Sequence, residues 1–188
     1  MLEEGGTIVN RNAIARTRRA CLVGALALFA AGCSTVDVAP RVELDRSARW
    51  AVLPLANRTE TPAAGLRAAA VVEGVLATRG VGNLVRPPSE LAAETLFDPP
   101  AKDAAERALA WARSADVRYA VTGSVTEWRY KVGVDGEPAV GITLQVIEVA
   151  SGRVLWSAAG ARSGFSREAL AAVAQKLVRE LTAPLARP

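Results

Sequence analysis

The chain has 188 residues, 51% of them hydrophobic, and a formal net charge of only +4, with both signs interspersed. This length allows one domain with a sizeable core, and the weak charge argues against a nucleic-acid partner, which needs a concentrated basic face. Histidine is absent, which excludes His-based triads and the commonest metal ligand. The two cysteines, Cys21 and Cys33, both fall in the first 33 residues, so thiolate catalysis in the folded domain is not expected.

Residues 1–32 have the layout of a lipoprotein signal peptide. Positive charges between Arg11 and Arg19 precede an apolar stretch, Cys21 to Ala31, that is too short to span a bilayer. The stretch ends in Ala-Ala-Gly-Cys, which resembles a bacterial lipobox, so we expect Cys33 to be acylated, palmitate included, and to anchor the protein. The alternative is an ordinary signal peptide with a chance cysteine. Ser34, where inner-membrane retention usually has aspartate, predicts the periplasmic face of the outer membrane.

Residues 33–48 are polar, contain Pro40 and show no periodicity. They predict a lipidated tether to a single domain over residues 49–188. From Ser34 to Ser47 this tether would be about 14 residues, or at most roughly 50 Å when fully extended. A short apolar strand is then expected at residues 49–57, with an interruption at Pro54, because proline cannot donate to a β-ladder.

Helices and strands alternate in the next part of the chain. A helix is predicted over residues 61–79, with Thr61 as its N-cap and Gly80 as its stop. A weak strand follows at residues 82–86 and a second helix at residues 102–114. Strands followed by helices, with further strands behind them, indicate an α+β fold with a mixed sheet.

Residues 118–162 alternate apolar and polar positions between glycine-containing turns, which is the pattern of an antiparallel meander with one buried face. The apolar positions change phase between Val125 and Trp128, which predicts a β-bulge near residues 126–127. We expect Trp128 and Tyr130 to leave the core face and to form an oligomer interface. The alternative is that the outer half of this hairpin shows both rings to solvent.

The last helix is expected after a Gly-Ser loop, with Ser166 as its N-cap and apolar residues facing the core. Phe165 lies on this loop. It either packs on Leu170 as a hydrophobic staple or inserts into a membrane interface. The predicted fold is therefore α+β, with a C-terminal antiparallel meander in a mixed sheet and helices packed on it.

Three stretches, at residues 50–57, 122–138 and 165–170, resemble the PelC family, the outer-membrane lipoproteins of Pel exopolysaccharide export in biofilms. The resemblance implies a fold like the N-terminal domain of TolB and a dodecameric ring beneath PelB, a porin and scaffold. It also implies an acidic funnel that guides a cationic polymer, to which Asp135 and Glu137 would contribute here. The pair Asp135-Gly136 equally suits an ordinary hairpin turn. Phe165 stands at the family's membrane-contacting position, where tryptophan is usual.

Two other functions compete with a ring lipoprotein of polysaccharide export. A lipoprotein that regulates a cell-envelope enzyme, such as a peptidoglycan synthase, needs a long disordered reach, and the short tether favours action near the membrane. An enzyme is disfavoured because Ser124, Ser157 and Ser166 show no nucleophile-elbow context. The sequence predicts a non-enzymatic protein without cofactor or metal. Its expected partners are the outer membrane, further copies of itself, a PelB-like porin and a cationic polysaccharide.

Overall fold

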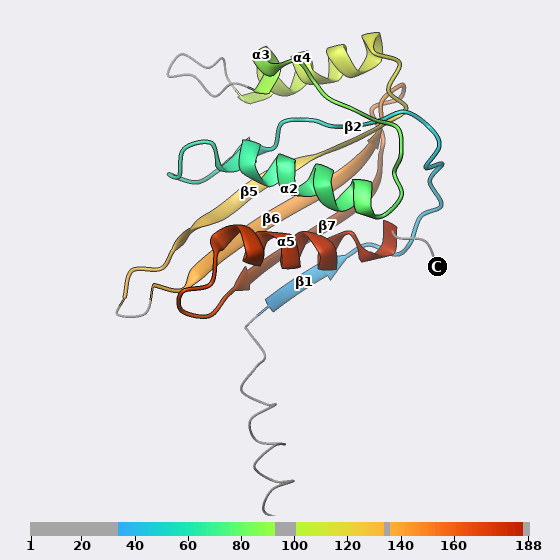
Figure 1. Cartoon of the computed structure of the whole chain (residues 1–188). Helices are drawn as coiled ribbons and strands as arrows, with labels where there is room; N and C mark the ends of the chain where they lie inside the picture. Colours follow the sequence, from blue (N-terminus) through green and yellow to red (C-terminus); the bar gives the residue numbers. More distant parts are fainter. Residues whose placement is uncertain (1–33, 93–100, 134–135, 186–188) are drawn as a thin grey trace, which may run out of the picture. The chain divides into compact units, whose positions relative to one another are not determined.

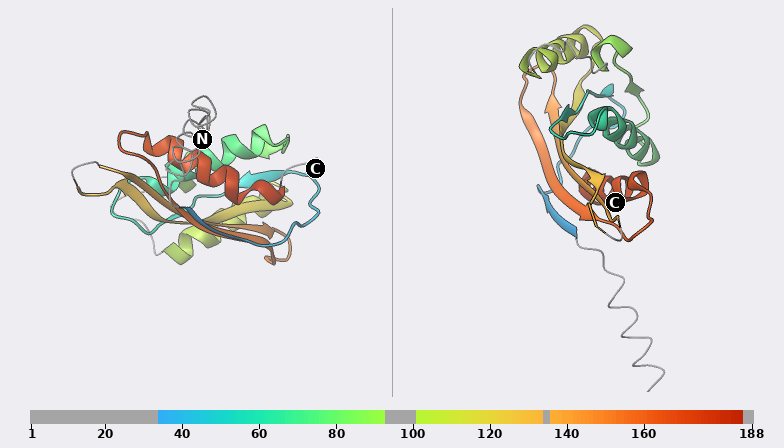
Figure 2. Two further views of the ribbon diagram at one scale, coloured as in Figure 1. Left: turned by 90° about the horizontal axis from the view of Figure 1, so that it is seen from below. Right: turned by 90° about the vertical axis from the view of Figure 1, so that its left-hand side faces the viewer.

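The computed structural model describes residues 34–92, 101–133 and 136–185. These residues form an α+β fold in which one mixed sheet carries helices on both faces (Figures 1 and 2). Within this described part, no helix is both long enough and apolar enough to cross a membrane. The predicted fold class, with its C-terminal meander, is confirmed.

The elements follow the chain in an order close to the predicted one. They are β1 (Ser34–Val38), β2 (Trp50–Val52), β3 (Ala56–Asn57), α2 (Ala64–Thr78), β4 (Leu84–Val85), α3 (Ser89–Ala92), α4 (Ala101–Ser114), β5 (Tyr119–Tyr130), β6 (Pro138–Glu148), β7 (Val154–Ser163), α5 (Leu170–Leu181) and a 3-10 turn, η1 (Ala183–Leu185). The strand order is β1-β7-β6-β5-β2-β4, with β3 also on β5. The pairs among β5, β6, β7 and β1 are antiparallel, whereas β2, β3 and β4 pair in parallel. As predicted, the first apolar strand breaks around Pro54, into β2 and β3.

The main core lies between one face of the sheet and helices α2 and α5 (Figure 2). Its largest fully buried side chains include Trp50, Trp156, Leu76, Ile142, Leu144, Leu177 and Leu181. A smaller cluster of mainly short side chains lies under α4 on the other face, and it includes Ala51, Ala108, Ala112 and Ala120.

The bulge predicted in the long hairpin is present, since the register of β5 against β6 shifts between Val125 and Glu127. The extra residue brings two side chains three positions apart onto the same face, so Val125 and Trp128 are both in the core, 0% and 3% exposed. The prediction that Trp128 leaves the core to form a subunit contact is therefore wrong. Tyr130, beyond the bulge, is 50% exposed.

The predicted tether is also wrong for residues 34–48. Strand β1 pairs antiparallel with β7 over its whole length, from Ser34 opposite Arg162 to Val38 opposite Ala158. Beyond the strand, the Ala39 amide donates to the carbonyl of residue 157 at 2.9 Å, and Val36, Val38, Val42 and Leu44 pack against the core. The domain therefore includes the residues directly after Cys33. Residues 1–33, with the predicted signal peptide and Cys33, lie outside the described residues.

Both predicted N-caps are wrong by a few residues. Helix α2 begins at Ala64, after Ala63 in a left-handed conformation, and the Thr61 hydroxyl instead donates to the Trp128 carbonyl at 2.6 Å. Helix α5 begins at Leu170 and has no side-chain cap from its N-cap residue. The predicted stop of α2 is confirmed, since Gly80 follows it at φ +82°, which suits glycine at a helix C-terminus.

Candidate functional site

Two loops meet at one end of the sheet, which we call the loop end: residues 129–133 and 136–138 of the β5–β6 hairpin, and residues 162–170 between β7 and α5 (Figure 1). The Gly164 amide donates to the Pro138 carbonyl at 2.8 Å. The Lys131 ammonium donates to the Ser163 hydroxyl at 2.7 Å. These bonds join the loops, so side chains that are far apart in sequence form one surface.

Tyr130 links the hairpin to the start of α5. Its hydroxyl donates to the Glu168 carbonyl at 3.3 Å and accepts from the Leu170 amide at 3.2 Å. The Leu170 amide is one of the donors that a helix N-terminus leaves without an intrahelical partner. Tyr130 thus supplies the cap that Ser166 was predicted to give. An oligomer contact for its half-exposed ring stays a prediction.

Phe165 is 54% exposed, whereas Leu170 packs against the core. About half of the Phe165 ring is therefore open to solvent, and the staple on Leu170 and the membrane contact both stay predictions. The loop behind it is held by Glu168, whose carboxylate accepts from the Phe165 amide at 3.2 Å and from the Lys176 ammonium at 2.5 Å. The bond from Lys176 is the main reason that the pKa of Glu168 lies below its usual value. A fixed loop thus presents an exposed aromatic ring.

Of the two acidic residues predicted to guide a polymer, the structure describes only Glu137. Glu137 is exposed, and its carbonyl accepts from the Lys131 amide at 2.7 Å across the hairpin. Asp135 lies outside the described residues. Nearby, Glu127 pairs with Arg129 at 3.1 Å and Glu168 pairs with Lys176. Within the described part of the loop end, Glu137 is thus an exposed carboxylate without an ion pair.

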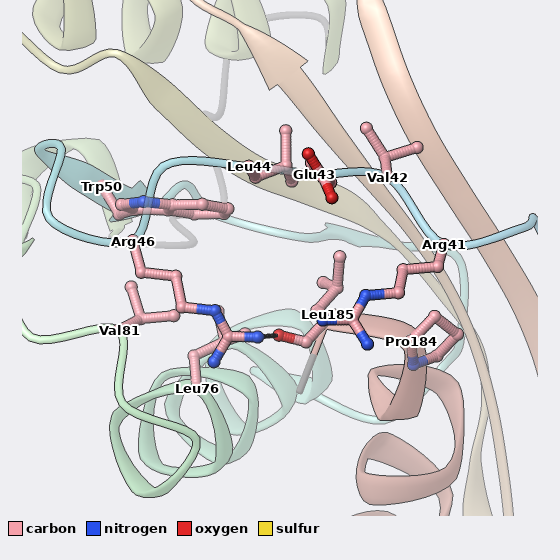
Figure 3. Close-up of a pocket in the computed structure, with 10 residues that line it drawn as sticks. All are labelled: Arg41, Val42, Glu43, Leu44, Arg46, Trp50, Leu76, Val81, Pro184 and Leu185. Atoms are coloured by element: carbon pink, nitrogen blue, oxygen red, sulfur yellow. Dashed lines mark hydrogen bonds between the residues drawn. The ribbon is translucent and has the colours of Figure 1, made fainter. Parts of the chain in front are cut away.

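A cavity of about 300 Å³ lies elsewhere, where residues 41–46 cross the ends of α2 and η1 (Figure 3). Arg41 and Arg46 point into it above apolar side chains. Arg46 donates to the Leu185 carbonyl and, at 2.7 Å, to the Arg79 carbonyl. Its guanidinium therefore satisfies carbonyls at helix ends. The cavity marks where the N-terminal segment, which the sequence suggested was a tether, is fixed to the domain.

The described residues contain no group of three or more carboxylate or thiol side chains placed to hold a metal ion. Ser124, one of the serines considered from sequence, shares a hydrogen bond of 2.8 Å with the Thr143 hydroxyl on the neighbouring strand. This is a cross-strand pair of the kind that stabilises sheets.

Neither protein-family models nor curated proteins match this sequence, but solved structures do. The PelC dodecamer from Paraburkholderia phytofirmans is 39% identical, with a TM-score of 0.70, over 83% of this chain and 100% of that one. A single-substitution variant of it is 38% identical, with a TM-score of 0.68, over 81% and 99%. Lipoprotein GNA1162 from Neisseria meningitidis, at 17% identity and a TM-score of 0.53 over 73% and 97%, shares the fold. These neighbours are PelC and a lipoprotein, not known enzymes. Because 39% identity extends over the whole of a solved PelC chain, this chain belongs to the PelC family.

Proposed function

We propose that this chain is a non-enzymatic outer-membrane lipoprotein that forms a ring and guides a cationic exopolysaccharide, Pel, to its porin. The observation that carries the proposal is the 39% identity to the whole of a solved PelC chain. That relative is a dodecamer, which supports a closed homo-oligomer of twelve subunits here. A PelB-like porin and scaffold is the proposed partner on the membrane side.

The anchor of this ring is Cys33, acylated after removal of residues 1–32. Strand β1 begins at Ser34, so hardly any chain separates the lipid from the folded domain. This supports action at the periplasmic face of the outer membrane. It also disfavours the regulator of a peptidoglycan synthase, because that function needs a disordered reach which the N-terminal segment of this domain does not supply.

In the proposed ring, Phe165 contacts the inner leaflet of the outer membrane and Tyr130 contributes to a subunit contact. Full burial of one phenylalanine contributes only about 1.5–3 kcal/mol, but a ring repeats the contact, and avidity makes the weak anchors cumulative. Asp135 and Glu137 repeat in the same way. Several like charges that converge in a ring raise the local concentration of a positive polymer without a tight site that would stop its movement.

Three variants test the proposal in cells that depend on this chain for polymer export. Cys33→Ser is expected to release the protein into the soluble periplasmic fraction and to abolish export. Phe165→Ala is expected to lower surface polymer while acylation and folding stay intact, and Phe165→Trp to preserve export. Light scattering on the purified protein is expected to give a particle far larger than a monomer. Normal export by the Cys33→Ser variant would contradict the proposed function.

A further inference from the structure

The exposed large hydrophobic side chains gather at one end of the domain. Among the described residues, four such side chains are strongly exposed: Tyr130 at 50%, Val132 at 102%, Val154 at 48% and Phe165 at 54%. Three of the four belong to the loop end. Single exposed apolar residues are ordinary on a soluble protein, but a group at one end indicates a contact surface.

The loops that carry Val132 and Phe165 are fixed to each other rather than independent. The bond from Lys131 to Ser163 starts one residue before Val132 and ends two residues before Phe165. The bond from Gly164 to Pro138 joins the same loops through their backbones. A surface that approached Phe165 from the loop end would therefore also meet the hairpin.

The start of the domain lies at this same end (Figure 1). Ser34 is paired with Arg162, two residues before Gly164, and β1 runs away from the loop end. The residue before Ser34 is Cys33, to which the proposed function assigns the lipid. An acylated Cys33 directly before β1 would hold the loop end against the bilayer, because no tether is present to let the domain turn away.

We propose that Val132 is a second membrane-inserting side chain, so that each subunit meets the bilayer through both Val132 and Phe165. Valine can enter the acyl boundary without desolvating a polar group. Lys131 can keep its ammonium at the lipid phosphates while its stem lies among apolar groups. Arg167, exposed on the other loop and without an ion pair among the described residues, supplies a second cation at that level. The backbone of Glu137 faces that of Lys131 across the hairpin, which puts Glu137 at the same headgroup depth.

The inference rests on the proposed lipid anchor and on the proposed Phe165 contact, and one experiment separates the three. The sequence has only two cysteines, Cys21 within the predicted signal peptide and Cys33. A Val132→Cys substitution in the full chain therefore gives the mature lipoprotein a single thiol for an environment-sensitive fluorophore. The labelled lipoprotein is reconstituted into vesicles of phosphatidylethanolamine and phosphatidylglycerol, with and without a lipid spin-labelled near the headgroup. Phe165→Cys and Val154→Cys carry the same label for comparison.

The fluorescence emission of the label at position 132 is expected to shift to shorter wavelengths on reconstitution. The spin-labelled lipid is expected to quench it as strongly as it quenches the label at position 165. The label at position 154, at the start of β7, is expected to do neither. Quenching at 165 but not at 132 overturns this inference and leaves the Phe165 contact standing. Quenching at neither position overturns both, and failure of the unlabelled chain to float with vesicles overturns the lipid anchor.

A second measurement removes the dependence on labels. In the mature chain with Cys33→Ser, which lacks both the acyl chains and residues 1–32, flotation with the same vesicles reports the loops alone. Val132→Asp is expected to lower the vesicle-bound fraction several-fold, while Val154→Asp leaves it unchanged and both keep the circular dichroism of the parent. Equal flotation of the Val132→Asp variant and its parent would refute membrane insertion at this position.

Discussion

Replacing Trp128 by alanine distinguishes a core residue from an interface residue. Its side chain is 3% exposed and packs within the main core under α2 and α5. Truncating a buried tryptophan to alanine costs about 3–5 kcal/mol, from lost transfer free energy and the cavity left behind. Domains of this kind are stable by only about 5–15 kcal/mol, so the change removes a large part of the free energy of unfolding. The hydrogen bond from Thr61 survives, since it is made to the backbone carbonyl.

The assay is urea unfolding of the Cys33→Ser protein, followed by far-ultraviolet circular dichroism at one fixed protein concentration, because assembly also adds stability. Tyr130→Phe is the matched control. It keeps the half-exposed ring and removes only the hydroxyl that caps α5, which is expected to cost about 1 kcal/mol. If Trp128→Ala costs no more than this control and instead dissociates the oligomer, then the tryptophan serves an interface and its assignment to the core is refuted.

Three further predictions follow from particular contacts. The double change Asp135→Asn with Glu137→Gln is expected to leave ring assembly intact and to lower surface polymer; normal export would remove this loop from the guiding surface. Gly160→Val places a Cβ only 2.8 Å from a β1 carbonyl and 3.2 Å from two leucine side chains of α5, which predicts a loss of about 1–3 kcal/mol in thermal or urea unfolding. Gly74→Ala, with open space around the new Cβ, should instead add about 0.5–1 kcal/mol; the reverse order would contradict the β1 pairing. The pKa of Glu168 is lowered on folding, so its stabilising effect is present above its unfolded pKa and is lost as pH falls through the folded pKa. Glu168→Gln should therefore flatten the acid limb of a stability–pH curve.

The sequence was most informative where structure is local. The period-two alternation predicted the meander, and the phase change between Val125 and Trp128 predicted the bulge. The prediction of where the bulge places Trp128 was wrong. An extra residue returns the side chain three positions on to the original face, so Trp128 rejoins Val125 in the core instead of leaving it. Alternation alone could not reveal this, because two structures give the same change of phase in the sequence. In one, the later apolar side chains leave the core face, and in the other, an extra residue returns them to it.

The N-terminal segment was missed for a different reason. Only Val36 and Val38 alternate there, and five residues give too short a pattern to distinguish a strand from a linker. The partner of β1 is β7, more than a hundred residues away, so no neighbouring turn signals the pairing. Likewise, Thr61 is a good N-cap by type, but a tertiary bond to the Trp128 carbonyl uses its hydroxyl. Contacts between residues far apart in the sequence also build the loop end. Its arrangement therefore could not be predicted from the sequence.

The ion pairs at and near the loop end limit which carboxylates can create the negative potential that would attract a cationic polymer. A carboxylate that pairs with a nearby cation leaves little net field outside the pair, whereas an unpaired carboxylate acts on other charges out to the Debye length of about 8–10 Å. Glu127 with Arg129, and Glu168 with Lys176, are such pairs. Glu137 is exposed and makes no ion pair among the described residues, so its charge reaches further into solvent. If Val132 also inserts into lipid, the Glu137 carboxylate lies at the level of the headgroups. A closed ring would then place one copy of this carboxylate per subunit around the opening that faces the porin. A polymer drawn by such charges would be collected beside the membrane exit rather than deep in the periplasm, and this position is consistent with a domain that has no tether.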